Sequence, residues 1–137
     1  MAALPFASGR VKALAFGVGL MAAYAVSAEQ PVSFSKDIAP LLKEHCAPCH
    51  LTGDEAGNMA LHPKAAYKTL VGTPSIESKL LRVKAGSSRE SYLVHKIEGT
   101  QLDVGGVGVR MPMEGAYLTD EEIAMIRRWI DAGAPEN

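Results

Sequence analysis

The stretch that decides the fold of this 137-residue chain is Cys46-Ala47-Pro48-Cys49-His50. Two cysteines separated by two residues and followed directly by a histidine form the C-x-x-C-H pattern that attaches a c-type haem. The two thiols add to the two vinyl groups of the porphyrin, and their spacing in the chain suits the spacing of those vinyls. His50 then falls beneath the iron as its proximal ligand. The pattern therefore predicts one covalently bound haem c.

Three other roles for two closely spaced cysteines fit this chain less well. A thioredoxin-like dithiol lies beside a βαβ pattern, whereas the segment before Cys46 has the pattern of a helix. A structural zinc site usually takes four Cys or His ligands, but Cys46 and Cys49 are the only cysteines and no His-x3–5-His pair follows them. A disulfide between cysteines three positions apart at a helix end is geometrically unfavourable.

The N-terminal residues predict export from the cytoplasm. Arg10 and Lys12 provide a positively charged start, and residues 13–26 form an uncharged apolar run. Val26-Ser27-Ala28 then offers small residues at the positions that a signal peptidase reads. The apolar run is shorter than the ~20 residues that a membrane-spanning helix needs, so it is typical of a cleaved signal peptide.

We therefore expect a signal peptide over residues 1–28 and one domain over residues 29–137, with an uncleaved N-terminal anchor as the alternative. Haem is joined to this motif outside the cytoplasm, so motif and leader together predict a periplasmic protein without membrane attachment after cleavage. The whole chain has 14 Lys+Arg and 15 Asp+Glu. Loss of Arg10 and Lys12 leaves 12 against 15, a net charge of −3, and this mild charge argues against nucleic acid as a partner.

Helices are predicted at both ends of the domain. An apolar stripe at i, i+3 and i+4 predicts a first helix that is capped by Asp37 and leads into the haem-binding motif. The last helix is expected to begin at Thr119, whose hydroxyl forms a capping box with Glu122. We expect Trp129, the single tryptophan, to pack in the core against the first helix near Phe34.

Two shorter helices are predicted between these. One covers residues 63–70. The other covers residues 88–98, begins with a capping box of Ser87 and Glu90, and ends at Gly99. Three apolar residues near the first of these helices are expected to line the wall of a haem crevice: Met59, Leu61 and Leu70.

Residues 101–117 are predicted to form a loop that passes close to the haem. They contain four glycines, which disfavour a regular helix or strand but give the backbone the freedom to approach a flat ring. Pro112 biases the residue before it toward an extended conformation, which can direct the thioether of Met111 at the iron. The other candidates for the distal position are Met113, His95, His62 and an open site.

Several stretches together carry a family resemblance: Phe34-Ser-Lys-Asp-Ile-Ala-Pro40, the C-x-x-C-H motif, Gly86 with Ser91-Tyr92-Leu93, Arg110-Met111-Pro112, Leu118-Thr-Asp-Glu-Glu-Ile123, and Trp129-Ile-Asp-Ala-Gly133-Ala134. The chain resembles a class I mono-haem cytochrome c, and most of all the planctomycete-type cytochrome c domains. The resemblance covers residues 32–134. It implies a small all-α fold in which the N-terminal and C-terminal helices cross around the covalently bound haem.

The resemblance also implies roles for individual residues. Cys46 and Cys49 would be the attachment sites, His50 the proximal ligand and Met111 the distal ligand. The family usually has a second proline or a polar residue where this chain has Met113, which keeps Met113 as a competing ligand. Four residues are candidates to hydrogen-bond the haem propionates: Arg110, Tyr92, Tyr67 and Arg82.

The implied function is electron transfer rather than catalysis. An iron with His and Met ligands is six-coordinate in both oxidation states, so few atoms move on electron transfer and no position is left for O₂ or peroxide. We expect a one-electron carrier whose partners are redox proteins: a dehydrogenase, an oxidase or a quinol-linked complex. The alternatives are a c-type haem subunit of a larger oxidoreductase, a haem enzyme or gas sensor with an open distal site, and a module that merely carries haem.

Overall fold

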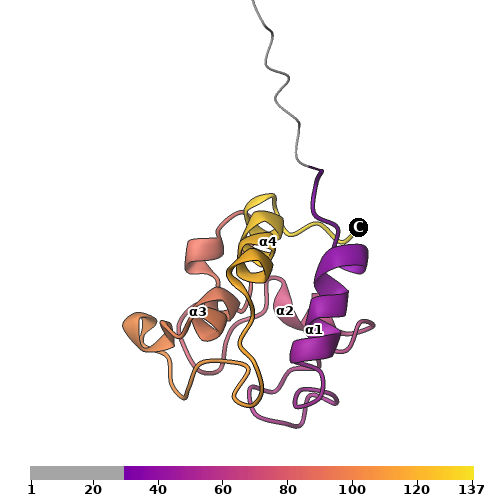
Figure 1. Ribbon diagram of the computed structural model, residues 1–137. Helices are drawn as coiled ribbons and strands as arrows, with labels where there is room; N and C mark the ends of the chain where they lie inside the picture. Colours follow the sequence, from indigo (N-terminus) through magenta and orange to yellow (C-terminus); the bar gives the residue numbers. More distant parts are fainter. Residues whose placement is uncertain (1–29) are drawn as a thin grey trace, which may run out of the picture.

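The computed structural model describes residues 30–137, and the predicted signal peptide lies outside this part of the chain. Figure 1 shows four α-helices joined by long irregular segments. The described residues contain isolated β-bridges but no strand, which confirms the prediction of an all-α domain at this level. The α-helices are α1 (Ala39–His45), α2 (Ala66–Leu70), α3 (Tyr92–Glu98) and α4 (Asp120–Asp131). Short π or 3₁₀ turns are η1 (Phe34–Ile38), η2 (Ser88–Glu90) and η3 (Gln101–Val104).

The first helical segment begins earlier than predicted. It starts at Phe34 with the π turn η1, and α1 follows directly. Ser33 is the N-cap, because its hydroxyl accepts a hydrogen bond from the Lys36 N–H at 3.4 Å. Asp37 is not the cap: its carboxylate reaches back and accepts from the Ser33 N–H at 2.7 Å. The Asp37 carboxylate and the Ser33 hydroxyl thus each accept a hydrogen bond from a backbone N–H at the start of the turn. The presence of one acidic residue in the sequence does not reveal this arrangement.

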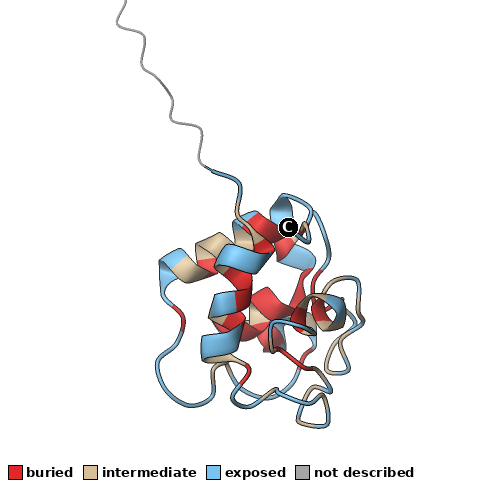
Figure 2. Ribbon diagram, turned by 90° about the vertical axis from the view of Figure 1, so that its right-hand side faces the viewer, coloured by how far each residue is buried: buried red, intermediate tan, exposed pale blue. Residues whose placement is uncertain are grey.

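A cluster of aromatic rings joins η1, α2 and α4. Trp129 is fully buried, and its ring centroid lies 5.5 Å from that of Phe34 and 6.5 Å from that of Tyr67. The indole N–H donates to the Pro135 carbonyl at 3.0 Å, which satisfies its polar group in the core. The prediction that Trp129 packs near Phe34 is therefore confirmed. Figure 2 shows how buried residues gather on the faces that the helices turn toward one another.

The helix predicted over residues 88–98 is interrupted at Ser91. Its backbone is extended there (φ −103°, ψ 117°), because the next amide, Tyr92 N–H, donates to the Leu81 carbonyl at 2.9 Å. The predicted capping box at this start is wrong: the Ser87 hydroxyl donates to the Glu90 carboxylate at 3.0 Å and caps no backbone group. The predicted end is confirmed, with Gly99 in the left-handed region at φ +83°.

The last helix has the predicted start. The Thr119 hydroxyl accepts from the Glu122 N–H at 3.2 Å, and the Glu122 carboxylate accepts from the Thr119 N–H at 2.8 Å, so the capping box is complete. Leu118 and Ile123, on either side of this start, are both buried in the same core. No helix within residues 30–137 has the length and apolarity needed to cross a bilayer.

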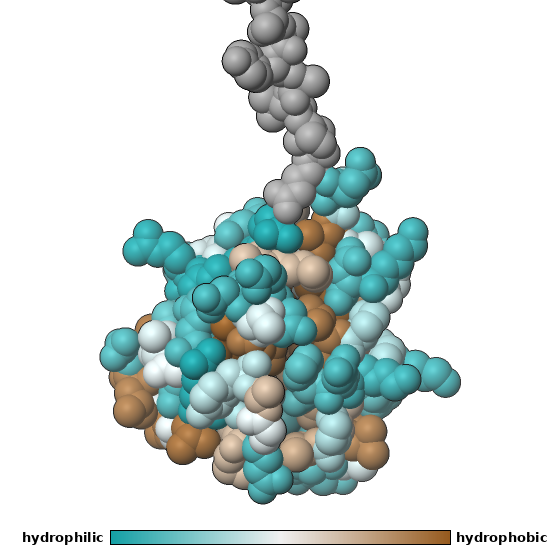
Figure 3. Space-filling view, viewed as in Figure 1, coloured by the Kyte–Doolittle hydropathy of each residue, from teal (hydrophilic) through white to brown (hydrophobic). Residues whose placement is uncertain are grey.

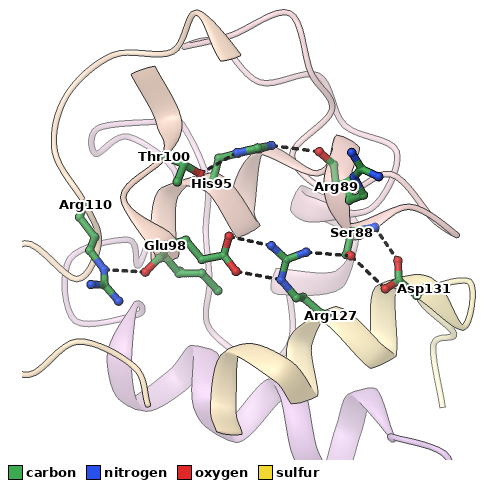
Figure 4. A network of polar contacts seen from close by, with 9 residues as sticks. Ser88, Arg89, His95, Glu98, Thr100, Arg110, Arg127 and Asp131 are labelled. Carbon is green, nitrogen blue, oxygen red and sulfur yellow. Dashed lines mark hydrogen bonds and ion pairs between the residues drawn. The ribbon is translucent and has the colours of Figure 1, made fainter. Parts of the chain in front are cut away.

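An ionic network fastens α4 to α3 and η2 (Figure 4). Arg127 on α4 makes a bidentate pair with Glu98 at the end of α3, at 2.8 and 2.7 Å. Its remaining nitrogen donates to the Ser88 hydroxyl at 3.2 Å, and that hydroxyl donates to Asp131 at 2.9 Å. Planar, two-point pairing of this kind fixes geometry better than a single contact does, so α3 is held in a defined place against α4.

Candidate functional site

A cavity of about 550 Å³ brings the C-x-x-C-H motif together with the methionine-bearing loop. Cys46, Cys49 and His50 line it from the end of α1, and Met111 and Met113 line it from the segment before α4. A cavity of this volume with a largely apolar lining is typical of a small-molecule or cofactor site. The apolar residues that complete the wall are Met59, Leu61, Leu70, Leu93 and Ile97. Three of them, Met59, Leu61 and Leu70, were predicted there.

The motif itself forms a tight turn after α1. The N–H groups of Cys49 and His50 both donate to the Cys46 carbonyl, at 3.2 and 3.0 Å, which sends all three side chains to the same cavity. The thiols are free rather than joined in a disulfide. Burial, and secondly the neighbouring Cys49, raises the pKa of the Cys46 thiol to about 11. A reactive redox dithiol needs a lowered thiol pKa, so this environment does not favour thiol–disulfide exchange.

His50 has a ring nitrogen that the described residues leave unsatisfied. Its Nδ1 is buried without a hydrogen-bond partner. A buried polar atom without a partner is uncommon in folded proteins and calls for an explanation. The loop that follows His50 closes back on it, since the Leu61 N–H donates to the His50 carbonyl at 2.7 Å. Gly57 in that loop lies beside the ring: a Cβ there would be in ordinary contact with His50 Cε1 at 3.9 Å and tight against Met59 Cε at 3.0 Å.

The structure separates the candidates for the distal position. Met111 is half-buried and lines the cavity, whereas Met113 lines its edge with 67% of its surface exposed. His95 does not line the cavity: its ring is held between the Thr100 hydroxyl at 2.8 Å and the Arg89 carbonyl at 3.0 Å (Figure 4). His62 does not line it either. Of the four side chains, the half-buried thioether of Met111 is thus the one best placed to share the cavity with His50.

The candidate propionate partners divide in the same way. Tyr92 is buried and lines the cavity, and burial raises the pKa of its phenol above the usual value. Arg82 also lines it, but its guanidinium donates to three backbone carbonyls. Arg110 lies outside, where its Nε donates to the Ile97 carbonyl at 2.7 Å (Figure 4) and its guanidinium stacks on the Tyr117 ring at 4.1 Å. Tyr67 is likewise outside, in the aromatic cluster.

Lys96 is a residue of the site that reading the sequence missed. It is buried and lines the cavity, although lysines are rarely buried without a partner. Its partner is Glu77, whose carboxylate lies 3.1 Å from the ammonium. The signal in the sequence was its position: Lys96 follows Tyr92 by four residues and precedes Ile97, both on the inner face of α3.

The mouth of the cavity is bordered by apolar surface. Figure 3 shows brown patches at the lower left and lower right of the face in view, among mostly teal side chains. Ile76 and Met113 both line the cavity and are more than half exposed. Other large apolar residues that are more than half exposed are Leu51, Leu102, Val107, Val109 and Tyr117.

Comparisons with known proteins leave the chain without a match: no protein-family model, no curated protein and no solved structure is significantly similar to it. Within residues 30–137 no three His, Cys, Asp or Glu side chains are grouped as ligands of a metal ion. The nitrogen and sulfur donors that line the cavity include the imidazoles of His45 and His50, two thiols and the thioethers of three methionines.

Proposed function

We propose that the protein is a periplasmic one-electron carrier of the cytochrome c type, and not an enzyme. In this proposal a single haem c is attached to Cys46 and Cys49, with His50 and Met111 as its axial ligands. The observation that carries the proposal is the convergence of the contiguous motif and the remote Met111 on one cavity. The small cytochrome c fold, with its crossing terminal helices, belongs to the same proposal.

The residues around the cavity fit this cofactor. The volume of about 550 Å³ and the apolar wall suit a large flat ring, the imidazole of His50 has a buried nitrogen without a partner, and both thiols are free. An imidazole and a thioether are together the ligands of electron-transfer haems, and the thioether favours the ferrous state. When bound, the haem supplies reversible one-electron chemistry at its iron. Tyr92 lines the cavity and remains a propionate partner in the proposal, whereas Arg110 does not.

An electron carrier suits these surroundings better than a haem enzyme does. A peroxidase-like site would use His95 or His62 as its distal acid or base, and neither residue lines the cavity. The exposed Ile76 and Met113 at its mouth offer a small apolar border. Small contact areas of this kind are typical of brief encounters between redox proteins, so a dehydrogenase, an oxidase or a quinol-linked complex is the expected class of partner.

The proposal is tested on the exported protein. We expect red material whose pigment stays with the polypeptide on a denaturing gel, and a Cys46→Ala/Cys49→Ala variant that is colourless. The oxidised protein should show the far-red charge-transfer band from methionine to ferric iron, and the reduced protein should not bind CO at neutral pH. Colourless protein, or pigment that acidified acetone extracts, would refute covalent attachment, and rapid CO binding would refute the carrier.

The distal ligand is tested by two matched variants. Met111→Ala should lose the far-red band and open the reduced iron to CO, because it removes the half-buried thioether. Met113→Ala should keep the band and exclude CO, because that side chain is largely exposed. The opposite pattern would make Met113 the ligand and leave the rest of the proposal in place.

A further inference from the structure

The cavity wall contains two buried cations. Arg82 and Lys96 are each only 8% exposed, and both line the cavity. A buried charge is costly unless hydrogen bonds and charge pairs compensate it, so the positions of their partners carry information. Both cations donate to backbone carbonyls: Lys96 to the segment that carries Met111, and Arg82 to the loop that follows His50 and to α2.

Lys96 holds the segment of Met111 at two points. Its ammonium donates to the Val107 carbonyl at 3.1 Å, while its own carbonyl accepts from the Met111 N–H at 2.8 Å. Glu77 accepts at 3.1 Å from the same ammonium and compensates its charge. The side chain and the main chain of one helical residue therefore fix both ends of residues 107–111.

Two neighbouring side chains also form hydrogen bonds with the same segment. The Tyr92 hydroxyl accepts from the Val107 N–H at 3.3 Å, and the Gln101 amide donates to the Gly108 carbonyl at 2.9 Å. Gly108 also lies close to Lys96, since a Cβ there would be 3.3 Å from the ammonium. This close approach leaves the segment little freedom to shift along α3.

Arg82 anchors the loop that follows His50. Its guanidinium donates to the carbonyls of Gly57 and Asn58, at 2.8 and 3.0 Å, and to that of Thr69 at 2.8 Å. Gly57 is the residue beside the His50 ring. Arg82 thus anchors the loop that follows the C-x-x-C-H motif. Its hydrogen bonds go to this loop and to Thr69, and none of them goes to residues 107–111.

We propose that Lys96 is the positioning residue of the distal ligand, which fixes residues 107–111 so that the Met111 thioether faces the cavity, and that Arg82 is its counterpart for the loop beside His50. This inference rests on the proposed function. It assigns to each axial side of the cofactor its own buried cation, so that the two sides can be disturbed separately.

The test compares Lys96→Leu with Arg82→Leu in the haem-loaded protein. A charge-assisted hydrogen bond in a buried place is strong enough that its loss speeds local opening by roughly tenfold to hundredfold. Lys96→Leu should therefore accelerate amide exchange at Met111 by that factor, reduce the far-red methionine band and allow CO to bind. Arg82→Leu should accelerate exchange at Leu61, whose N–H bonds to His50, and keep the band.

Two results would overturn the inference. One is a Lys96→Leu protein that keeps both the band and the protection of the Met111 amide. The other is a loss of the band in both variants in proportion to their loss of stability, as a merely structural role would give. If Lys96→Leu does not fold, Glu77→Gln/Lys96→Leu removes both charges, leaves no unpaired carboxylate, and is measured in the same way.

The same experiments separate this inference from the proposed function. If the parent protein has no methionine band, or if Met111→Ala keeps it, the assignment of the distal ligand fails. Exchange at the Met111 amide in Lys96→Leu then still reports whether Lys96 fixes the segment. If the parent and Met111→Ala behave as proposed and Lys96→Leu does not, the positioning role alone is refuted.

Discussion

Replacement of Gly106 by alanine should destabilise the protein through a steric clash with Tyr92. A Cβ at this position would lie 2.6 Å from Tyr92 Cε2 and 2.7 Å from the Gln101 carbonyl oxygen, and closer still to the Tyr92 hydroxyl. The backbone of Gly106 is not in the left-handed region, so alanine there would otherwise gain about 0.4–1 kcal/mol by restricting the unfolded chain. Overpacking of a filled site costs about 1–3 kcal/mol, and we expect a net loss of roughly 1–2 kcal/mol.

Gly105→Ala is the matched control for this substitution. Gly105 has open space around its missing side chain but a left-handed backbone, at φ +70°, so alanine there costs about 1 kcal/mol of backbone strain. Urea denaturation of both variants, each with and without Tyr92→Phe, separates the two causes. The Gly106 cycle should show a coupling of at least ~0.5 kcal/mol, whereas the Gly105 cycle should be additive within about that amount. No destabilisation by Gly106→Ala would refute the steric explanation, whereas additive behaviour at Gly106 would assign the clash to the Tyr92 ring and the Gln101 carbonyl instead of the hydroxyl.

Three further predictions concern the helices, the core and the loop after the C-x-x-C-H motif. Thr119→Ala should lower the free energy of unfolding by about 1 kcal/mol through loss of the capping box, seen as a lower urea midpoint at unchanged slope. Trp129→Ala should cost about 3–5 kcal/mol, because it empties a fully buried site in the aromatic cluster; a loss below 1 kcal/mol would show that the cluster is not a core. Backbone N–H groups of Thr52 and Gly53 lower the pKa of the Glu55 carboxyl from 4.5 to about 2. The stabilising effect of the Glu55 carboxylate should thus be complete above about pH 4.5 and decrease as the pH falls toward 2. The free energies of unfolding of the parent and of Glu55→Gln should therefore converge over that interval. A constant difference between them down to pH 2 would contradict this.

The features that the sequence predicts well are those with a local physical cause. The C-x-x-C-H turn depends on five contiguous residues, and the start of α4 on the three-residue spacing of Thr119 and Glu122. Gly99 ends α3 because a left-handed backbone is cheapest for glycine. The apolar wall residues Met59, Leu61 and Leu70 could be named because few apolar side chains lie near the motif in the chain.

The features that the sequence misses depend on contacts between distant segments. Ser87 and Glu90 have the spacing of a capping box, yet the pairing of the following backbone with Leu81 interrupts the helix there. Arg110 stands next to Met111 in the chain, but the carbonyl of Ile97 and the ring of Tyr117 direct its side chain elsewhere. Lys96 looks like any helical lysine until Glu77 and Val107 surround it.

The placement of the site residues along the chain has a consequence for how such a protein matures. Cys46, Cys49 and His50 follow one another within a single turn, whereas Met111 reaches the cavity only when α3 and its bound segment are in place. Under the proposed function the pigment can be joined to a chain that is still extended, while its sulfur–iron bond forms last. Absorption at the far-red end of the spectrum would then report the completion of folding, and it could be followed during refolding without an added label.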